Sequence, residues 1–133
     1  MSDTLPVVQI VTQKAAGDCG IVVLAMYLGK SYEDVFAATV QETNAHIHND
    51  GMWVTQIKRV AKALGVTLRR QKAWNMDEDA GMLILDGSRR TDGMHHVVLL
   101  KAGLIFNTDG LVWEPDVFLK HFRYRPTGLL VRA

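Results

Sequence analysis

Cys19 is the single cysteine of this 133-residue chain, and it stands just ahead of an apolar stretch, residues 21–28. Asp18 favours the N-cap position, so Cys19 is predicted to lie in the first turn of a helix. There the helix dipole favours the thiolate. Gln13, upstream, can offer an amide donor to a developing oxyanion. The pattern is typical of an acyl-transfer site or, alternatively, of a buried cysteine acting as a small apolar side chain.

A cysteine nucleophile needs a base within hydrogen-bonding reach, and histidine is the usual one. His95 and His96 open an apolar segment, residues 95–101, which is predicted as a central strand after the loop 86–94. Neighbouring side chains on a strand point to opposite faces, so only one of the two can meet Cys19. A histidine at the end of a buried strand can also be structural. The other three histidines are His46, His48 and His121.

Some further polar and aromatic residues can have either a functional or a purely structural role. His46, His48 and Asp50 are spaced so that they can bind a metal, but a solvated loop explains them as well. Trp53 can contact a substrate, although tryptophans are more often partly buried anchors. The loop 86–94 can form a rim beside the histidines or be an ordinary solvated loop. We expect the chemistry to need no cofactor and no metal.

The elements that must position these residues follow from apolar periodicity and from turn residues. A buried central helix is expected at 21–28, ending at Gly29, a second helix from Ser31, and an amphipathic helix that Thr55 caps and that runs to residue 64. Strands are expected at 7–11, 66–70, 82–85, 95–101, 104–108 and 111–113, a helical turn at 116–121, and an edge strand at 128–131. Helices followed by an antiparallel sheet predict an α+β domain.

The bulk composition is that of one ordinary globular domain, residues 1–133. Apolar residues make up 48% of the chain, charged residues 22%, and the net charge is +1, so no nucleic-acid footprint is predicted. No apolar stretch approaches the roughly 20 residues of a membrane span, and no signal peptide is recognised. A single cysteine cannot form an internal disulfide, which favours a cytoplasmic location.

Three short motifs stand in a characteristic order: Gln13, the sequence DCG at 18–20 ahead of an apolar helix, and the sequence HHVVL at 95–99. Residues 51–65 add a glycine and a threonine before an amphipathic helix that ends at glycine. Together they resemble papain-like cysteine peptidases, most closely the bacteriocin-processing branch, which cleaves double-glycine leader peptides. The resemblance extends over roughly residues 7 to 120. It implies a papain-like fold, with N-terminal helices packed on a C-terminal antiparallel sheet.

The resemblance assigns roles to individual residues. Cys19 matches the nucleophile, and Gln13 matches the glutamine of the oxyanion hole, where the backbone N–H of Cys19 is the second donor. His95 matches the general base. His96 takes a position that the family usually fills with an aromatic residue, which leaves open which of the two histidines carries the chemistry.

The residue that orients the histidine can be sought by strand geometry. If residues 102 and 103 form a tight hairpin turn, Lys101 pairs with Leu104, and Asp109 then falls near the histidines while Asn107 falls deeper in the strand. We therefore favour Asp109 over Asn107 as the third member. The Asp-Pro pair usual in the family is absent, because Gly110 follows Asp109.

These residues predict a cysteine peptidase that cleaves a peptide bond in a peptide or protein substrate, a stand-alone relative of the leader-processing enzymes. The same triad can run deamidation or acyl transfer instead. A third reading is a catalytically inactive module that binds peptides. The oligomeric state is not predicted.

Overall fold

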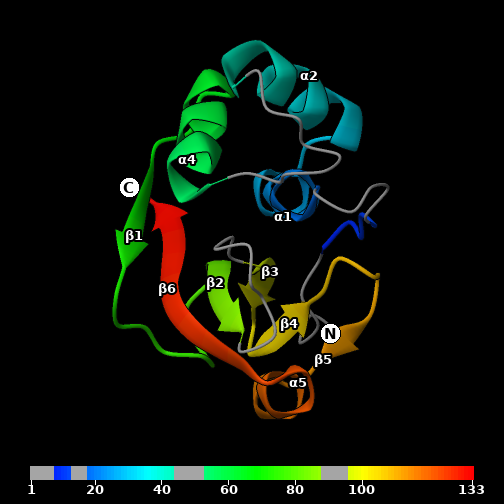
Figure 1. Ribbon diagram of the computed structural model, residues 1–133, viewed down its shortest axis with the longest axis vertical. Coiled ribbons are helices and arrows are strands. Elements are labelled where there is room, and N and C mark those ends of the chain that lie inside the picture. Colours follow the sequence, from blue (N-terminus) through cyan, green and yellow to red (C-terminus); the bar gives the residue numbers. More distant parts are fainter. Residues whose placement is uncertain (1–7, 13–17, 44–52, 88–95) are drawn as a thin grey trace, which may run out of the picture.

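The computed structural model describes residues 8–12, 18–43, 53–87 and 96–133 (Figure 1). Several residues singled out in the sequence lie outside these ranges: Gln13, His46, His48, Asp50 and His95. In the described part, three helices and a six-stranded sheet follow in the order expected of an α+β domain, with one more helix near the C-terminus. The predicted fold class is confirmed.

The N-terminal helices begin and end close to the predicted residues. Helix α1 (Cys19–Leu28) follows Asp18 as its N-cap and ends at Gly29, whose φ of 68° is the left-handed conformation that glycine adopts freely. Helix α2 (Tyr32–Thr43) begins after Ser31, whose hydroxyl accepts a hydrogen bond of 3.1 Å from the backbone N–H of Asp34.

Helix α4 (Val54–Ala63) begins slightly earlier than predicted. Its N-cap is Trp53 rather than Thr55. The backbone N–H of Trp53 donates to the side-chain oxygen of Gln56 at 2.8 Å, which is half of a capping box. The expected cap is therefore wrong, because a glutamine reaching back can replace the hydroxyl cap that the sequence pattern favours. No helix among the described residues is long and apolar enough to cross a membrane.

The sheet is antiparallel throughout, with strand order β1-β6-β2-β3-β4-β5. Its strands are β1 (Leu68–Gln71), β2 (Gly81–Gly87), β3 (His96–Lys101), β4 (Leu104–Phe106), β5 (Val112–Trp113) and β6 (Tyr124–Arg132). The segment 7–11 was expected to be a strand or an extended arm, and its described residues form no regular element.

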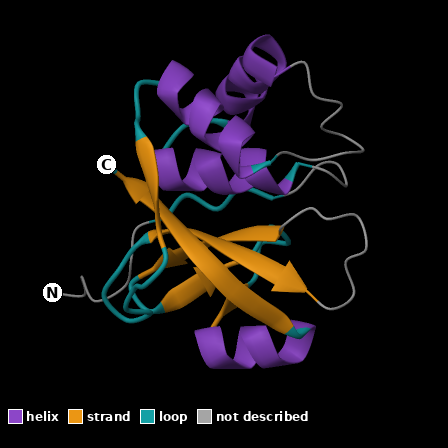
Figure 2. Cartoon of the chain, turned by 60° about the vertical axis from the view of Figure 1, so that its left-hand side comes forward, coloured by secondary structure: helices purple, strands orange, loops and turns teal. Residues whose placement is uncertain are grey.

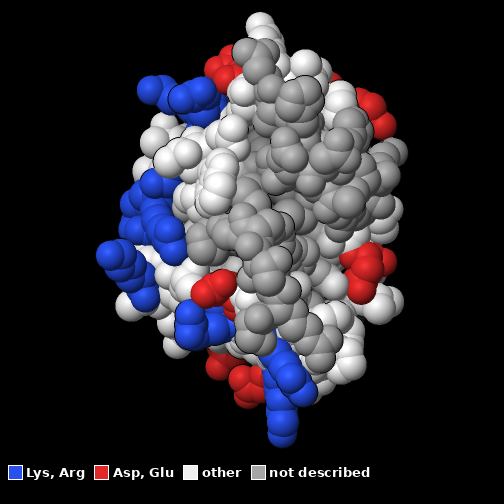
Figure 3. All heavy atoms as spheres, in the orientation of Figure 1, with Lys and Arg blue, Asp and Glu red and all other residues white. Residues whose placement is uncertain are grey.

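The last strand, β6, does not lie at the edge of the sheet as predicted. Residues 128–131 were predicted as an edge strand, but β6 lies between β1 and β2, and Gly128, Leu129 and Leu130 are buried. The edges are β1 and β5. The prediction was wrong because strand order depends on long-range pairing. Arg69 and Arg70 of β1 are exposed, on the side where Figure 3 shows Lys and Arg side chains gathered, and such charges protect an edge from unwanted pairing.

Alternating side chains of the sheet divide the core in two. Helices lie on both faces of the sheet (Figure 2). Val97, Leu99 and Phe106 face the layer formed by α1, α2 and α4. Val98, Leu100 and Ile105 face the opposite side, where they pack with Phe118 of helix α5 (Pro115–Phe122). Strand β3 is therefore covered on both faces, and a residue's number along it decides which layer its side chain meets.

Candidate active site

Cys19 is the first residue of α1, and its half-buried side chain packs against the core under the N-terminal helices. The rest of the helix holds it firmly, since every residue from Gly20 to Met26 is buried. The carbonyl of Asp18 accepts the first intrahelical hydrogen bond, 3.1 Å from the N–H of Val22. The predicted placement of the thiol at a helix N-terminus is confirmed, and there the helix dipole favours its thiolate.

The side chain of Asp18 has an unexpected partner. Asp18 is only 1% exposed, and its Oδ2 accepts a hydrogen bond of 2.7 Å from the hydroxyl of Tyr32, the first residue of α2. Burial raises the pKa of Tyr32 most, and the hydrogen bond to Asp18, the charge of Asp18 and the charge of Glu33 raise it further. Sequence reasoning missed this contact, because nothing local links residues 14 positions apart.

His96 opens β3 on the face of the sheet that is turned away from α1. It pairs with Leu85, a residue of the α5-side core, whereas the next pair, Ile84 with Val97, belongs to the core under α1. The ring of His96 stacks on Tyr124 with centroids 5.4 Å apart and an interplanar angle of 20°. Cys19 and His96 therefore lie in different layers. His95 is outside the described residues.

The hairpin that follows β3 has the predicted register, since Lys101 pairs with Leu104. After β4 the chain turns: the N–H of Asn107 donates to the carbonyl of Leu111 at 3.0 Å, and the N–H of Gly110 donates to the carbonyl of Asn107 at 3.1 Å. Gly110 has a φ of 87°, which such a tight reversal requires.

The two candidates for the orienting residue lie in this turn with different partners. Asn107 is 8% exposed, and its Oδ1 lies 3.3 Å from Nε2 of His96. Asp109 is exposed, and its Oδ1 accepts a hydrogen bond of 2.9 Å from the N–H of Leu111. The structure thus brings Asn107 and His96 together, and it places Asp109 at the tip of the turn.

The same turn meets the segment that leads to the predicted oxyanion glutamine. A Cβ placed on Gly110 would come within 3.0 Å of Cγ2 of Thr12 and 4.0 Å of Cγ2 of Ile10. Thr12 directly precedes Gln13 in the sequence, and Gly110 directly follows Asp109. Residues 10–12 and the turn after β4 therefore lie side by side although they are distant in sequence, which the sequence alone did not indicate.

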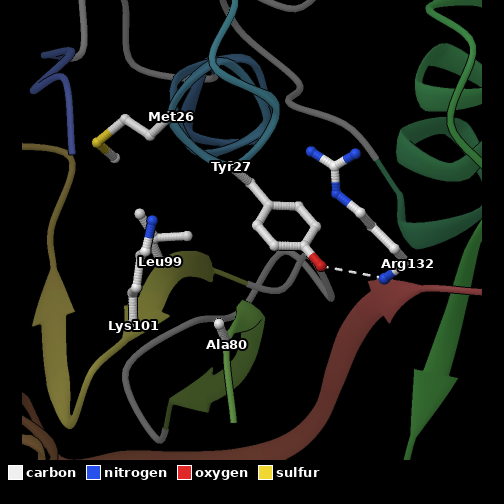
Figure 4. A pocket seen from close by; sticks show the side chains of 6 residues that line it. All are labelled: Met26, Tyr27, Ala80, Leu99, Lys101 and Arg132. Carbon is white, nitrogen blue, oxygen red and sulfur yellow. Dashed lines mark hydrogen bonds between the residues drawn. The ribbon is translucent and has the colours of Figure 1, made fainter. Parts of the chain in front are cut away.

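The other end of α1 holds a separate hollow of about 200 Å³ (Figure 4). It is lined by Met26, Tyr27, Ala80, Leu99, Lys101 and Arg132. The hydroxyl of Tyr27 accepts a hydrogen bond of 3.0 Å from the backbone N–H of Arg132, which ties this end of α1 to β6. Among residues 8–12, 18–43, 53–87 and 96–133, no cluster of three or more His, Cys, Asp or Glu could hold a metal.

Comparisons with known proteins agree with this architecture. Residues 7–108 match the model of the peptidase C39 family. Among solved structures, the fold is similar to the peptidase domain of Streptococcus ComA, a bi-functional ABC transporter involved in a quorum-sensing pathway. That match has a TM-score of 0.58 and 17% identity, and it covers 92% of this chain and 96% of the other. No curated protein matches the sequence.

Proposed function

Because this chain belongs to the peptidase C39 family and is therefore a cysteine peptidase, we propose that Cys19 is the nucleophile that attacks the scissile peptide bond of a peptide or protein substrate. The observation that carries this proposal is the position of the thiol. Cys19 is half-buried at the first residue of a helix whose following seven residues, Gly20 to Met26, are all buried. Such a helix fixes the sulfur in place and favours its thiolate.

We propose His95 as the general base. What supports this choice is the position of its neighbour: His96 lies on the α5 side of the sheet, stacked on Tyr124, while Cys19 packs in the layer on the other side. Successive residues of a strand alternate between faces, so the face of His96 is the wrong one for the base. The family motif assigns the same role to His95.

In the proposed reaction the Cys19 thiolate attacks the carbonyl carbon while His95 is protonated. Gln13 and the backbone N–H of Cys19 stabilise the tetrahedral oxyanion. The C–N bond then breaks, and His95 gives its proton to the leaving amine. His95 next takes a proton from water, and the resulting hydroxide hydrolyses the thioester, which releases the acid product and restores the Cys19 thiolate beside protonated His95.

Asp109 is the proposed orienting residue for His95. Its support is the closeness of the next residue, Gly110, to Thr12, which directly precedes Gln13. The exposed side chain of Asp109 also holds the N–H of Leu111. Substitution at this position must therefore be read for stability and for turnover separately.

The experiment is a digest of synthetic double-glycine leader peptides with the purified protein, followed by mass spectrometry. We expect chain cleavage that is lost in Cys19→Ala and in Gln13→Ala. A gain of about one dalton without cleavage would mark the protein as a deamidase. Peptide binding by the wild type without turnover would mark an inactive module. Either result would overturn the proposed peptidase reaction.

A further inference from the structure

Asp18 occupies the N-cap position of α1 without using its side chain as a cap. An aspartate at this position ordinarily accepts a hydrogen bond from the backbone N–H of the second or third helical residue. Within the described residues, no such bond joins the Asp18 carboxylate to α1. The carboxylate accepts the hydroxyl of Tyr32 at 2.7 Å instead. The side chain of Asp18, which directly precedes the proposed nucleophile, is therefore bonded to α2 and does not cap α1.

We propose that Tyr32 is a positioning residue, which holds the Asp18 carboxylate off the first turn of α1 so that the N–H groups and the dipole of that turn act on the sulfur of Cys19. This inference rests on the proposed role of Cys19. A capping carboxylate and a thiolate compete for the same positive end of the helix, since both are anions. A carboxylate that swung onto the first turn would disfavour the thiolate and would raise the pKa of the thiol.

The surroundings of Tyr32 make the hydroxyl separable from the ring. The ring stacks on Phe36 with centroids 6.0 Å apart and an interplanar angle of 23°. A phenylalanine at position 32 can keep this contact and lose only the donor. Besides Asp18, the titratable group that acts on Tyr32 in the described structure is Glu33 of α2.

The test measures the rate of Cys19 alkylation by iodoacetamide as a function of pH. In Tyr32→Phe we expect the acid limb of the profile to move to higher pH, by roughly half a pH unit to one pH unit. Below that limb the alkylation rate then falls about threefold to tenfold, because the thiolate fraction falls in proportion. Tyr27→Phe is the matched control, since it removes one tyrosine hydroxyl near the C-terminal end of α1, the end away from Cys19 (Figure 4).

A second pair of variants separates this role from a general loosening of the helices. Repeating Tyr32→Phe in an Asp18→Ala background, and again in Asp18→Asn, removes the charged carboxylate that the hydroxyl is proposed to hold. We expect the shift caused by Tyr32→Phe to disappear in both backgrounds while circular dichroism shows a folded chain.

Two results would overturn the inference. One is an acid limb that is the same in Tyr32→Phe as in the wild type. The other is a shift that persists without the Asp18 carboxylate. The proposed peptidase reaction fails on a different result, a wild-type Cys19 that alkylates no faster than a free thiol at every pH. The two failures are therefore distinguishable.

Discussion

Substitution of His95 is expected to lower turnover strongly, whereas substitution of the adjacent His96 is expected to change turnover little. His95→Ala removes the proposed base, and general acid–base catalysis contributes roughly 100- to 10,000-fold, so turnover should fall by that order. His96→Phe keeps an aromatic ring beside Tyr124, whose present stack has centroids 5.4 Å apart, and it loses the contact of 3.3 Å with Asn107. Because His96 lies in the layer away from Cys19, turnover should change little.

The size of the second effect follows from these contacts. A hydrogen bond of this kind contributes about 0.5–1.5 kcal/mol to stability, and an aromatic pair contributes about as much beyond its buried area. His96→Phe loses the hydrogen bond to Asn107 and keeps the stack on Tyr124, so it should lower the free energy of unfolding by about 1 kcal/mol. Even if all of this cost appeared in the transition state, it would lower the rate only about fivefold.

The assay is steady-state cleavage of a leader peptide by both variants, with urea unfolding to confirm that each is folded. The ratio of kcat for His96→Phe to that for His95→Ala should exceed about tenfold, given the two magnitudes above. If His96→Phe abolishes turnover in a folded protein while His95→Ala retains it, the face argument is wrong and His96 is the base.

Four further predictions concern stability and the turn that carries Asp109. Gly81→Ala should lower the free energy of unfolding by at least about 2 kcal/mol in urea titrations, because its Cβ would lie 2.3 Å from the carbonyl oxygen of Leu130. A Cβ at position 29 would meet no atom within 4 Å, so Gly29→Ala should cost only about 1–2 kcal/mol, for a φ of 68°. If Gly81→Ala and Gly29→Ala lower the free energy of unfolding equally, this steric account is refuted. The pKa of Tyr32 is higher in the folded protein than in the unfolded chain. The contribution of protonated Tyr32 to the free energy of unfolding is therefore fully present below a pH of about 10, and it is lost as the pH rises further. Tyr32→Phe should therefore flatten the alkaline decline in melting temperature, and an unchanged decline would contradict the assigned cause. Asp109→Ala should lower kcat about tenfold or more with little change in KM if Asp109 orients the base, whereas a loss of stability alone would limit Asp109 to closing its turn.

Local chemistry explains why helix α1 and its cysteine could be predicted. The apolar run after Asp18 and the glycine at position 29 are signals that act within one or two turns of chain, and the observed helix begins and ends where they place it. The hairpin register was predictable for the same reason, since a tight turn dictates the pair formed by Lys101 and Leu104. The motif spacing around Cys19 indicated the family, which the match over residues 7–108 confirms.

Other features depend on contacts between segments far apart in sequence. The strand at 128–131 was expected at an edge, yet it lies inside the sheet because β1 and β2 both pair with it. Its apolar residues suit a buried strand, but nothing in them specifies which partners they take. The helix at 54–63 likewise begins with a hydrogen bond from the backbone N–H of Trp53 to the side chain of Gln56, where a hydroxyl cap was expected.

By itself, the sequence determined that a thiol would begin a buried helix and that His96 would stand at the start of an apolar strand, because apolar periodicity and turn residues act over short distances. Only the tertiary structure decided that His96 belongs to the layer away from Cys19, and that the Asp18 carboxylate is held by Tyr32. Both depend on which elements pack together, and that packing is set by the burial of whole faces rather than by any one residue.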